Sequence, residues 1–235
     1  MELGLLHLAI APGIAIVLFI YFRDKYEKEP FWLLLTCFFL GALTIIPPIF
    51  IEMAGDHFSP DSHPSSFGIL IYAFLFVGLS EELSKFLLLR SFPYNTRHFN
   101  EPFDGIVYSV VISMGFATAE NIFYVFQNGV GTGLLRMFTA VPGHAAFGVL
   151  MGFFVGLSKF KKHNFGLLLT GVIAATTAHG FYDYFLFQKD VEGLQILAFV
   201  CLALAIILSF RAMRIHKRIS PFNPDNKPNI PTNAG

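Results

Sequence analysis

Residues 67–89 read FGILIYAFLFVGLSEELSKFLLL, an apolar stretch interrupted by one short charged group. A membrane-spanning helix needs about 20 consecutive, mostly apolar residues. The stretch is therefore long enough to cross a bilayer, although it carries Glu81, Glu82 and Lys85. A charge at the bilayer centre costs about 2.5–3.5 kcal/mol on insertion scales. The sequence thus predicts a transmembrane helix whose charges have internal partners or a function.

The rest of the chain has the same character. Of its 235 residues, 54% are hydrophobic and 14% are charged, whereas about 25% are charged in soluble domains. Seven stretches of sufficient length lie near residues 4–22, 31–51, 67–89, 104–126, 134–157, 165–187 and 194–213. We therefore expect an all-α polytopic transmembrane bundle with about seven spans, formed by one membrane domain over residues 1–218. The Pro- and Asn-rich tail, 219–235, is expected to be disordered.

The basic residues predict how the chain is oriented. They follow the first, third, fifth and seventh expected spans: Arg23, Lys25, Lys28, Arg90, Arg97, Lys159, Lys161, Lys162, Arg211, Arg214, Lys217 and Arg218. The loops after the second and fourth spans have none, and the loop after the sixth has only Lys189. The positive-inside rule then puts the N-terminus outside and the tail in the cytoplasm. No basic residue precedes the first span, so we expect a retained helix rather than a cleaved signal peptide.

Seven ionisable side chains fall inside the expected spans: Glu81, Glu82, Lys85, Glu120, His144, His179 and Asp183. Two pairs, Glu81 with Lys85 and His179 with Asp183, are four residues apart and share a helix face. The rise of 1.5 Å per residue puts Glu81, Glu120, His144 and His179 at depths of roughly 9 to 21 Å from the outer end. We expect these groups to converge on one cavity in the outer half of the bilayer or near its centre.

Glycine and proline patterns indicate how the helices pack. Gly148, Gly152 and Gly156 recur at four-residue spacing, which is typical of close helix contact in membranes. Pro47 and Pro48 predict a break in the second span, because proline removes a backbone hydrogen bond. Asp104 is expected to cap the start of the fourth span and to stay outside the site.

Three kinds of chemistry suit buried carboxylates and histidines. A carboxylate can activate water for peptide-bond hydrolysis, while a second group stabilises the oxyanion. Histidine and carboxylate also suit a zinc ion. A relay of acids and histidines can conduct protons in a transporter. No HExxH or GxSxG motif is present, so a zincin-type or rhomboid-type site is not supported.

Four segments taken together resemble a known family. They read EELSK (81–85), GFATAEN (115–121), PGHAAFGVLMGF (142–153) and HGFYD (179–183); APGIA (11–15), DKYEKEP (24–30) and FDGIVY (103–108) fit as well. They resemble the PrsW family of bacterial intramembrane proteases, which is related to the CAAX-prenyl-protease and bacteriocin-immunity superfamily. The resemblance covers the chain up to about residue 218. A His often stands in that superfamily where this chain has Glu120, and the chain follows the PrsW version.

The resemblance implies a protease in the bacterial cell membrane that makes the first, outer-side cut in a single-pass anti-sigma factor. A second protease then cuts within the membrane and a sigma factor is released. The partners expected are this substrate and the lipid bilayer. Nucleic acid is not expected, since the formal net charge is zero and no basic patch stands out.

Roles for the residues follow from the resemblance. Glu81 is expected to be the general base that activates water, with Glu82 as its partner and Lys85 paired to one of them. Glu120 and His144 would bind the water or a metal, and Asn121 would support Glu120. His179, oriented by Asp183, would stabilise the oxyanion.

A metal requirement is left open by the resemblance, because the superfamily has been described both as metalloproteases and as metal-independent glutamic proteases. The sequence favours glutamic-type catalysis with no required cofactor. If zinc is present, the expected ligands are Glu81, Glu120, His144 and His179. A proton- or ion-coupled transporter and a non-catalytic membrane scaffold are the alternatives to a protease. A transporter often has an internal repeat, and none is evident between the two halves of this chain.

Overall fold

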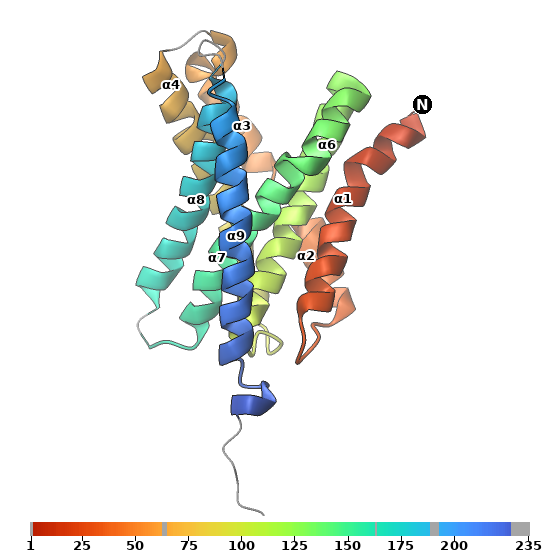
Figure 1. Cartoon of the computed structure of the whole chain (residues 1–235), viewed down its shortest axis with the longest axis vertical. Helices are drawn as coiled ribbons and strands as arrows, with labels where there is room; N and C mark the ends of the chain where they lie inside the picture. The colour runs from red at the N-terminus through yellow and green to blue at the C-terminus, as the bar shows by residue number, and fades with distance from the viewer. Residues whose placement is uncertain (1, 63–64, 163, 189–192, 227–235) are drawn as a thin grey trace, which may run out of the picture.

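The computed structural model describes residues 2–62, 65–162, 164–188 and 193–226, and within them every regular element is a helix. Figure 1 shows long helices packed side by side as one bundle. The longer elements are α1 (Glu2–Arg23), α2 (Phe31–Leu43), α3 (Ile46–Ala54), α4 (Ser66–Ile71), the π-helical η3 (Tyr72–Leu79), α5 (Ser80–Ser91), α6 (Pro102–Phe138), α7 (Ala140–Lys159), α8 (Phe165–Phe187) and α9 (Ile196–Ile219). The prediction of an all-α polytopic bundle is confirmed.

Six helical segments in the described ranges are long and apolar enough to cross a membrane, and one of them runs for 58 residues from Pro102 to Lys159. This long segment folds back on itself at Gly129, whose φ of 81° and ψ of −167° residues with a Cβ rarely adopt. Arg136 Nε donates a hydrogen bond to Asn121 Oδ1 at 2.9 Å. In a straight helix these residues would be about 22 Å apart. The number of membrane crossings stays a prediction.

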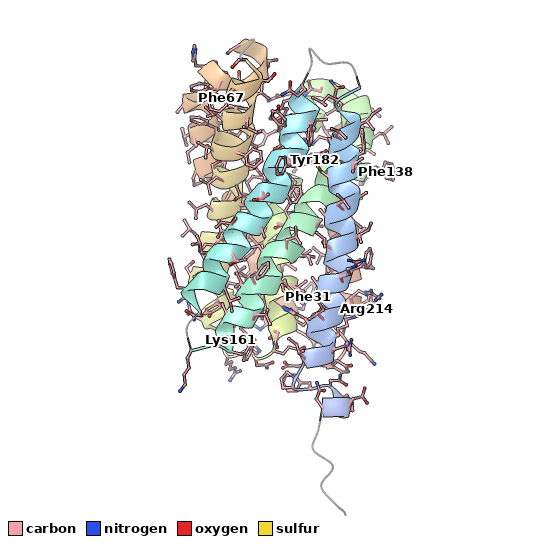
Figure 2. The ribbon with its side chains drawn as sticks, turned by 60° about the vertical axis from the view of Figure 1, so that its left-hand side comes forward. Phe31, Phe67, Phe138, Lys161, Tyr182 and Arg214 are labelled. Atoms are coloured by element: carbon pink, nitrogen blue, oxygen red, sulfur yellow. The ribbon has the colours of Figure 1, made fainter. Side chains whose placement is uncertain are left out.

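The two ends of the bundle differ in their residues. Figure 2 shows Lys161 and Arg214 near one end of the bundle and Phe67 near the other. Figure 1 shows the N-terminus at the end opposite the C-terminal end of α9. The basic residues labelled thus share one end, as the positive-inside interpretation requires. Which end faces the cytoplasm stays a prediction.

Two sequence features at helix ends behave as expected. The second span is broken: α2 ends at Leu43 and α3 begins at Ile46, with proline in its first turn. Asp104 Oδ2 accepts hydrogen bonds from the backbone N–H groups of Asn100 and Glu101 at 2.7 and 2.8 Å. This carboxylate therefore caps the start of α6, as predicted.

The predicted tail is described only in part. Residues Pro224–Asn226 form a short 3-10 turn. The Asn226 amide donates to the carbonyl oxygens of Arg218 and Ser220 at 2.7 and 3.0 Å. The expected disorder of residues 227–235 lies outside the described residues and stays a prediction.

The first arm of α6 is the centre of the bundle, since residues 102–118 are all buried. It packs against α1, α2 and α7. Glycine allows the closest approach to α7: a Cβ on Gly152 would lie 2.7 Å from Ile106 Cα and would overlap the carbonyl oxygen of Gly105. The small-residue packing face predicted at Gly148, Gly152 and Gly156 lies on α7, and it is confirmed at Gly152.

Replacing Gly152 with alanine should therefore destabilise the protein. The added methyl group meets backbone atoms of α6, which cannot move aside as a flexible side chain could. We expect a loss of about 1–3 kcal/mol, measured by unfolding of the purified protein in detergent. Gly166→Ala is the matched control, because a Cβ at Gly166 meets nothing within 4 Å. Equal destabilisation by the two changes would contradict the predicted contact.

A group of buried acids links the α1–α2 connection to the start of α6. Neither carboxylate oxygen of Asp24 has a hydrogen-bond partner among the described residues. Glu29 accepts a hydrogen bond from the Tyr108 hydroxyl. Burial raises the pKa of Asp24 to about 7, with a further contribution from the charge of Glu101. Burial also raises the pKa of Glu29 to about 7.

These raised pKa values predict that stability depends on pH. The unfolded chain releases both protons near pH 4, where the folded protein still holds them. The two acids therefore contribute stability at pH 4 that is lost as the pH rises to about 7. The test compares wild type with Asp24→Asn/Glu29→Gln in detergent. As the pH rises from about 4 to about 7, the unfolding free energy of wild type should fall relative to that of the variant. If the difference in unfolding free energy between the two proteins does not depend on pH, the prediction is wrong.

Candidate active site

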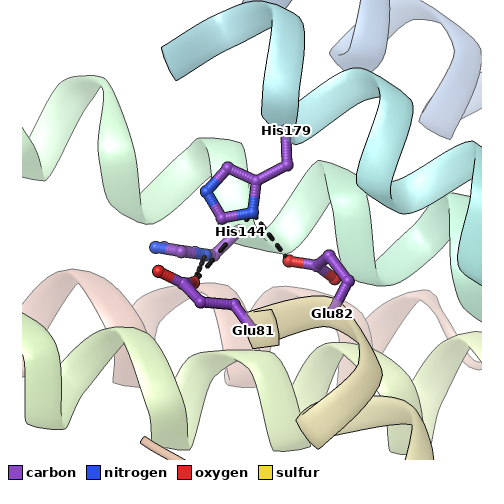
Figure 3. A group of neighbouring side chains, drawn as sticks. All are labelled: Glu81, Glu82, His144 and His179. Atoms are coloured by element: carbon purple, nitrogen blue, oxygen red, sulfur yellow. Dashed lines mark hydrogen bonds and ion pairs between the residues drawn. The ribbon is translucent and has the colours of Figure 1, made fainter. Parts of the chain in front are cut away.

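The side chains predicted for the site come together from four helices. α5 supplies Glu81, Glu82 and Lys85, α6 supplies Glu120, α7 supplies His144, and α8 supplies His179 and Asp183. Figure 3 shows the two glutamates facing the two imidazole rings. A cavity of about 280 Å³ is lined by Glu81, Glu120, His144, His179 and Asp183. Glu82 does not line this cavity and is fully buried behind it.

Lys85 is the cation at the centre of this cluster. Its Nζ lies 3.0 Å from Glu81 Oε2, 2.8 Å from Glu82 Oε1 and 3.2 Å from His144 Nδ1. It also lies 3.9 Å from the centroid of the Phe116 ring. The side chain is 1% exposed, so solvent hardly screens these contacts. The predicted pair between Lys85 and the neighbouring glutamates is confirmed, and Lys85 contacts both of them.

Each histidine has a carboxylate on its far side. His144 Nε2 lies 2.9 Å from Glu120 Oε2, and His179 Nε2 lies 3.1 Å from Asp183 Oδ2. An ammonium group only donates hydrogen bonds, so the contact with Lys85 requires a lone pair on His144 Nδ1. The proton of a neutral His144 ring then lies on Nε2 and is donated to Glu120. In each ring, Nδ1 is the nitrogen that faces the two glutamates.

His179 has carboxylates on both of its nitrogens. Its Nδ1 lies 3.0 Å from Glu82 Oε1, in addition to the contact of Nε2 with Asp183. These two contacts suit a ring that is protonated on both nitrogens and donates to both carboxylates. They also suit a neutral ring that donates from Nε2 to Asp183, while Nδ1 and Glu82 bind the same cation. The Phe147 ring stacks on His179 at 4.7 Å between centroids and 21° between planes, which further restricts the ring.

The local fold explains why α5 and α8 come so close. The π-helical segment η3 directly precedes Ser80 at the start of α5. Such segments are frequent at functional sites. A Cβ on Gly78 would lie 3.3 Å from the backbone nitrogen of Gly180, which is next to His179. Glycine at position 78 therefore lets the backbone of η3 approach α8, and Gly180 leaves room for the Phe74 ring of η3. This close packing brings His179 within reach of Glu82, which follows η3 on α5.

Arg136 also lines the cavity and was not among the site residues predicted from the sequence. Its Nη2 lies 2.6 Å from Glu120 Oε2, and its guanidinium carbon lies 4.0 Å from the centroid of the Tyr124 ring. Asn121 binds Arg136 and also donates to the carbonyl oxygen of Ala9 at 3.2 Å. The expected support of Glu120 by Asn121 thus runs through Arg136. Helical spacing could not reveal this, because the chain reverses between them at Gly129.

The donors fit a zinc ion, which binds imidazole nitrogen and carboxylate oxygen. One atom each of Glu81, Glu82, His144 and His179 lies within 4.8 Å of the others. The carboxylates behind both imidazoles are the usual outer partners of metal-bound histidine. Glu82 takes the place predicted for Glu120 in this ligand set, because Glu120 lies on the far side of His144. The Lys85 ammonium already lies among these donors, so a metal ion would have to displace it.

Comparisons with known proteins agree with this chemistry. The family model described as PrsW family intramembrane metalloprotease matches residues 29–209. Protease PrsW of Geobacillus kaustophilus is 38% identical over 81% of this chain and 83% of that protein. The protein of that name from Oceanobacillus iheyensis is 36% identical over 92% of this chain and 97% of that protein. Its counterpart in Bacillus subtilis is 36% identical over 75% of this chain and 80% of that protein. No solved structure was found to match.

The match spans well over half of the chain and includes all the residues of the cluster. The resemblance seen in the motifs is thereby confirmed. The chain therefore belongs to the PrsW family of intramembrane proteases and is a multi-pass bacterial membrane protein that hydrolyses peptide bonds.

Proposed function

We propose that this protease makes the first, outer-side cut in a single-pass membrane anti-sigma factor, with water activated by Glu81. The observation that carries the mechanism is the position of Glu81, which lines the cavity while its carboxylate contacts Lys85. Glu82 lies behind it and bonds to both Lys85 and His179. The names of the relatives favour a protease over the transporter or scaffold alternatives.

In the proposed reaction Glu81 takes a proton from water, and the water oxygen attacks the carbonyl carbon of the scissile peptide bond. His179 stabilises the resulting oxyanion with its Nδ1–H, which exchanges its contact with Glu82 for the oxyanion while Asp183 holds the ring through Nε2. Glu81 then returns the proton to the leaving amine as the carbon–nitrogen bond breaks. The products are an amine and a carboxylic acid, which releases its remaining proton to water and becomes a carboxylate, and Glu81 is ready for another cycle. Glu120 and His144 help to hold the attacking water.

The role of Lys85 favours this metal-independent form. The Lys85 ammonium lies among the two glutamates and His144 and does part of what a bound cation would otherwise do: it offsets the negative charge of the carboxylates. If zinc is bound instead, Glu81, Glu82, His144 and His179 would hold it, and it would lower the pKa of a bound water. Metal content decides between the two forms. About one zinc per chain, with activity lost to a chelator and restored by zinc, would overturn the metal-independent proposal.

The substrate is tested by cleavage in proteoliposomes. The purified protein is reconstituted with a tagged single-pass anti-sigma factor from the same organism, and the products are mapped by mass spectrometry. We expect a cut near the outer membrane surface. A single-pass protein with an unrelated outer segment is the control. A cut on the cytoplasmic side would overturn the outer-side role. No cut, together with solute uptake driven by a pH gradient, would favour the transporter.

Arg136→Gln should lower the rate of cleavage by about 10–100-fold, as loss of an outer partner typically does. Arg136 holds Glu120, and Glu120 holds His144, so we infer a positioning role. The effect is expected on kcat rather than on KM, with partial rescue by Arg136→Lys. Arg97→Gln, at an exposed position, is the control. An effect on KM alone would indicate that Arg136 binds substrate instead.

A further inference from the structure

One acidic side chain at the cavity has no part in the proposed reaction. Glu52 lies on α3 and lines the same cavity as Glu81 and Glu120. Among the described residues, no Lys, Arg or His nitrogen lies within 4.0 Å of its carboxylate. The other cavity carboxylates all have such a partner: Glu81 has Lys85, Glu120 has Arg136 and Asp183 has His179. Glu52 is the described cavity carboxylate left without a cation.

The surroundings of Glu52 favour a cation still more strongly. The charged groups that act on it are chiefly Glu81, Glu120 and Asp183, with His179 as the weaker opposite charge. Tyr72 also lines the cavity and lies close enough to interact electrostatically with Glu52. Aromatic faces attract ammonium and guanidinium groups. A carboxylate beside an aromatic ring, in a cavity with excess negative charge, is suited to a basic side chain.

The position of Glu52 indicates where such a side chain would come from. Glu52 lies two residues before the end of α3, and α3 and α4 lie near the end of the bundle that is expected to face outward. Ser84 Oγ on α5 donates a hydrogen bond to the Thr44 carbonyl oxygen at 2.7 Å, so these two residues lie at one level. Glu52 lies eight residues beyond Thr44 toward that end. Glu81 lies only three residues from Ser84, so Glu52 is the outer of the two. A substrate chain that leads from the scissile bond toward the outer surface would therefore pass Glu52.

We propose that Glu52 binds a lysine or arginine side chain of the substrate, on the outer side of the scissile bond. This rests on the proposed proteolysis and adds the substrate feature that the cavity selects. The charge of the substrate residue then pairs with Glu52, which has no cation among the described residues, and the excess negative charge of the cavity falls by one.

The experiment is a charge swap in proteoliposomes. Each outer juxtamembrane position of the cleaved anti-sigma factor is changed in turn to lysine, glutamine and glutamate, and kcat/KM is measured for each. For wild type we expect one position where lysine is cut about tenfold better than glutamine, as for one charge-assisted hydrogen bond. Glu52→Gln should bring this ratio close to one. Glu52→Lys should reverse it in favour of glutamate.

Asp56→Asn is the matched control, because Asp56 is an exposed acid just beyond α3 and outside the cavity lining. It should keep the lysine preference. A preference unchanged in Glu52→Gln would overturn the inference while leaving the proposed proteolysis intact. A preference lost equally in Asp56→Asn would also overturn it, since the cause would then be long-range attraction. If wild type cuts none of the substrates, the proposed function fails and the inference fails with it.

Discussion

Glu81→Gln is expected to lower the rate of cleavage by about 10²–10⁴-fold, the usual contribution of a general base. Glutamine has nearly the same shape and still accepts a hydrogen bond from Lys85, but it cannot take a proton from water. The measurement is cleavage of the anti-sigma substrate in proteoliposomes, with the unfolding curve of each variant as evidence that it is folded.

Glu82→Gln is the comparison that separates the two neighbouring glutamates. Glu82 does not line the cavity, and it acts through Lys85 and His179. We therefore expect a smaller loss of about 10–100-fold, as for an outer partner. If Glu82→Gln is the inactive variant and Glu81→Gln keeps most activity, the two roles are reversed. If both variants cleave like wild type, neither glutamate is catalytic.

Lys85→Met should be the most destabilising single change at the site. The side chain is almost fully buried and pairs with two buried carboxylates at 3.0 and 2.8 Å. Removing one partner from a buried ion pair costs about 3–5 kcal/mol, because it leaves an uncompensated charge. Methionine keeps most of the length and the apolar stem of lysine, so the loss of unfolding free energy would measure the contribution of the charge. Unfolding of the purified protein in detergent measures it.

Two further variants make this prediction specific. Lys161→Met removes a lysine at an exposed position and should have little effect. Glu82→Gln/Lys85→Met should recover part of the stability, since the second change removes one of the buried negative charges that the loss of Lys85 leaves in excess. A Lys85→Met protein as stable as wild type would contradict the prediction. It would point to another cation among these donors, which the zinc content of the same sample would reveal.

Much of this site could be predicted from local sequence. The length and apolarity of residues 67–89 determine a spanning helix, because backbone groups in lipid must bond within the segment. The spacing of Glu81 with Lys85, and of His179 with Asp183, determines which pairs share a helix face. Both pairs are in direct contact in the structure, at 3.0 and 3.1 Å. These features depend only on helix geometry, which the sequence alone specifies.

Other features were decided by the tertiary structure. The reversal at Gly129 brings Arg136 to Glu120 across 16 residues, and the break after Leu43 lets α3 place Glu52 at the cavity. The rotation of α5 turns Glu81 toward the cavity and Glu82 away from it. Helix rotation, crossing and reversal depend on packing between distant segments. Local periodicity carries no information on them, so Arg136, Glu52 and the division between the glutamates emerged only in three dimensions.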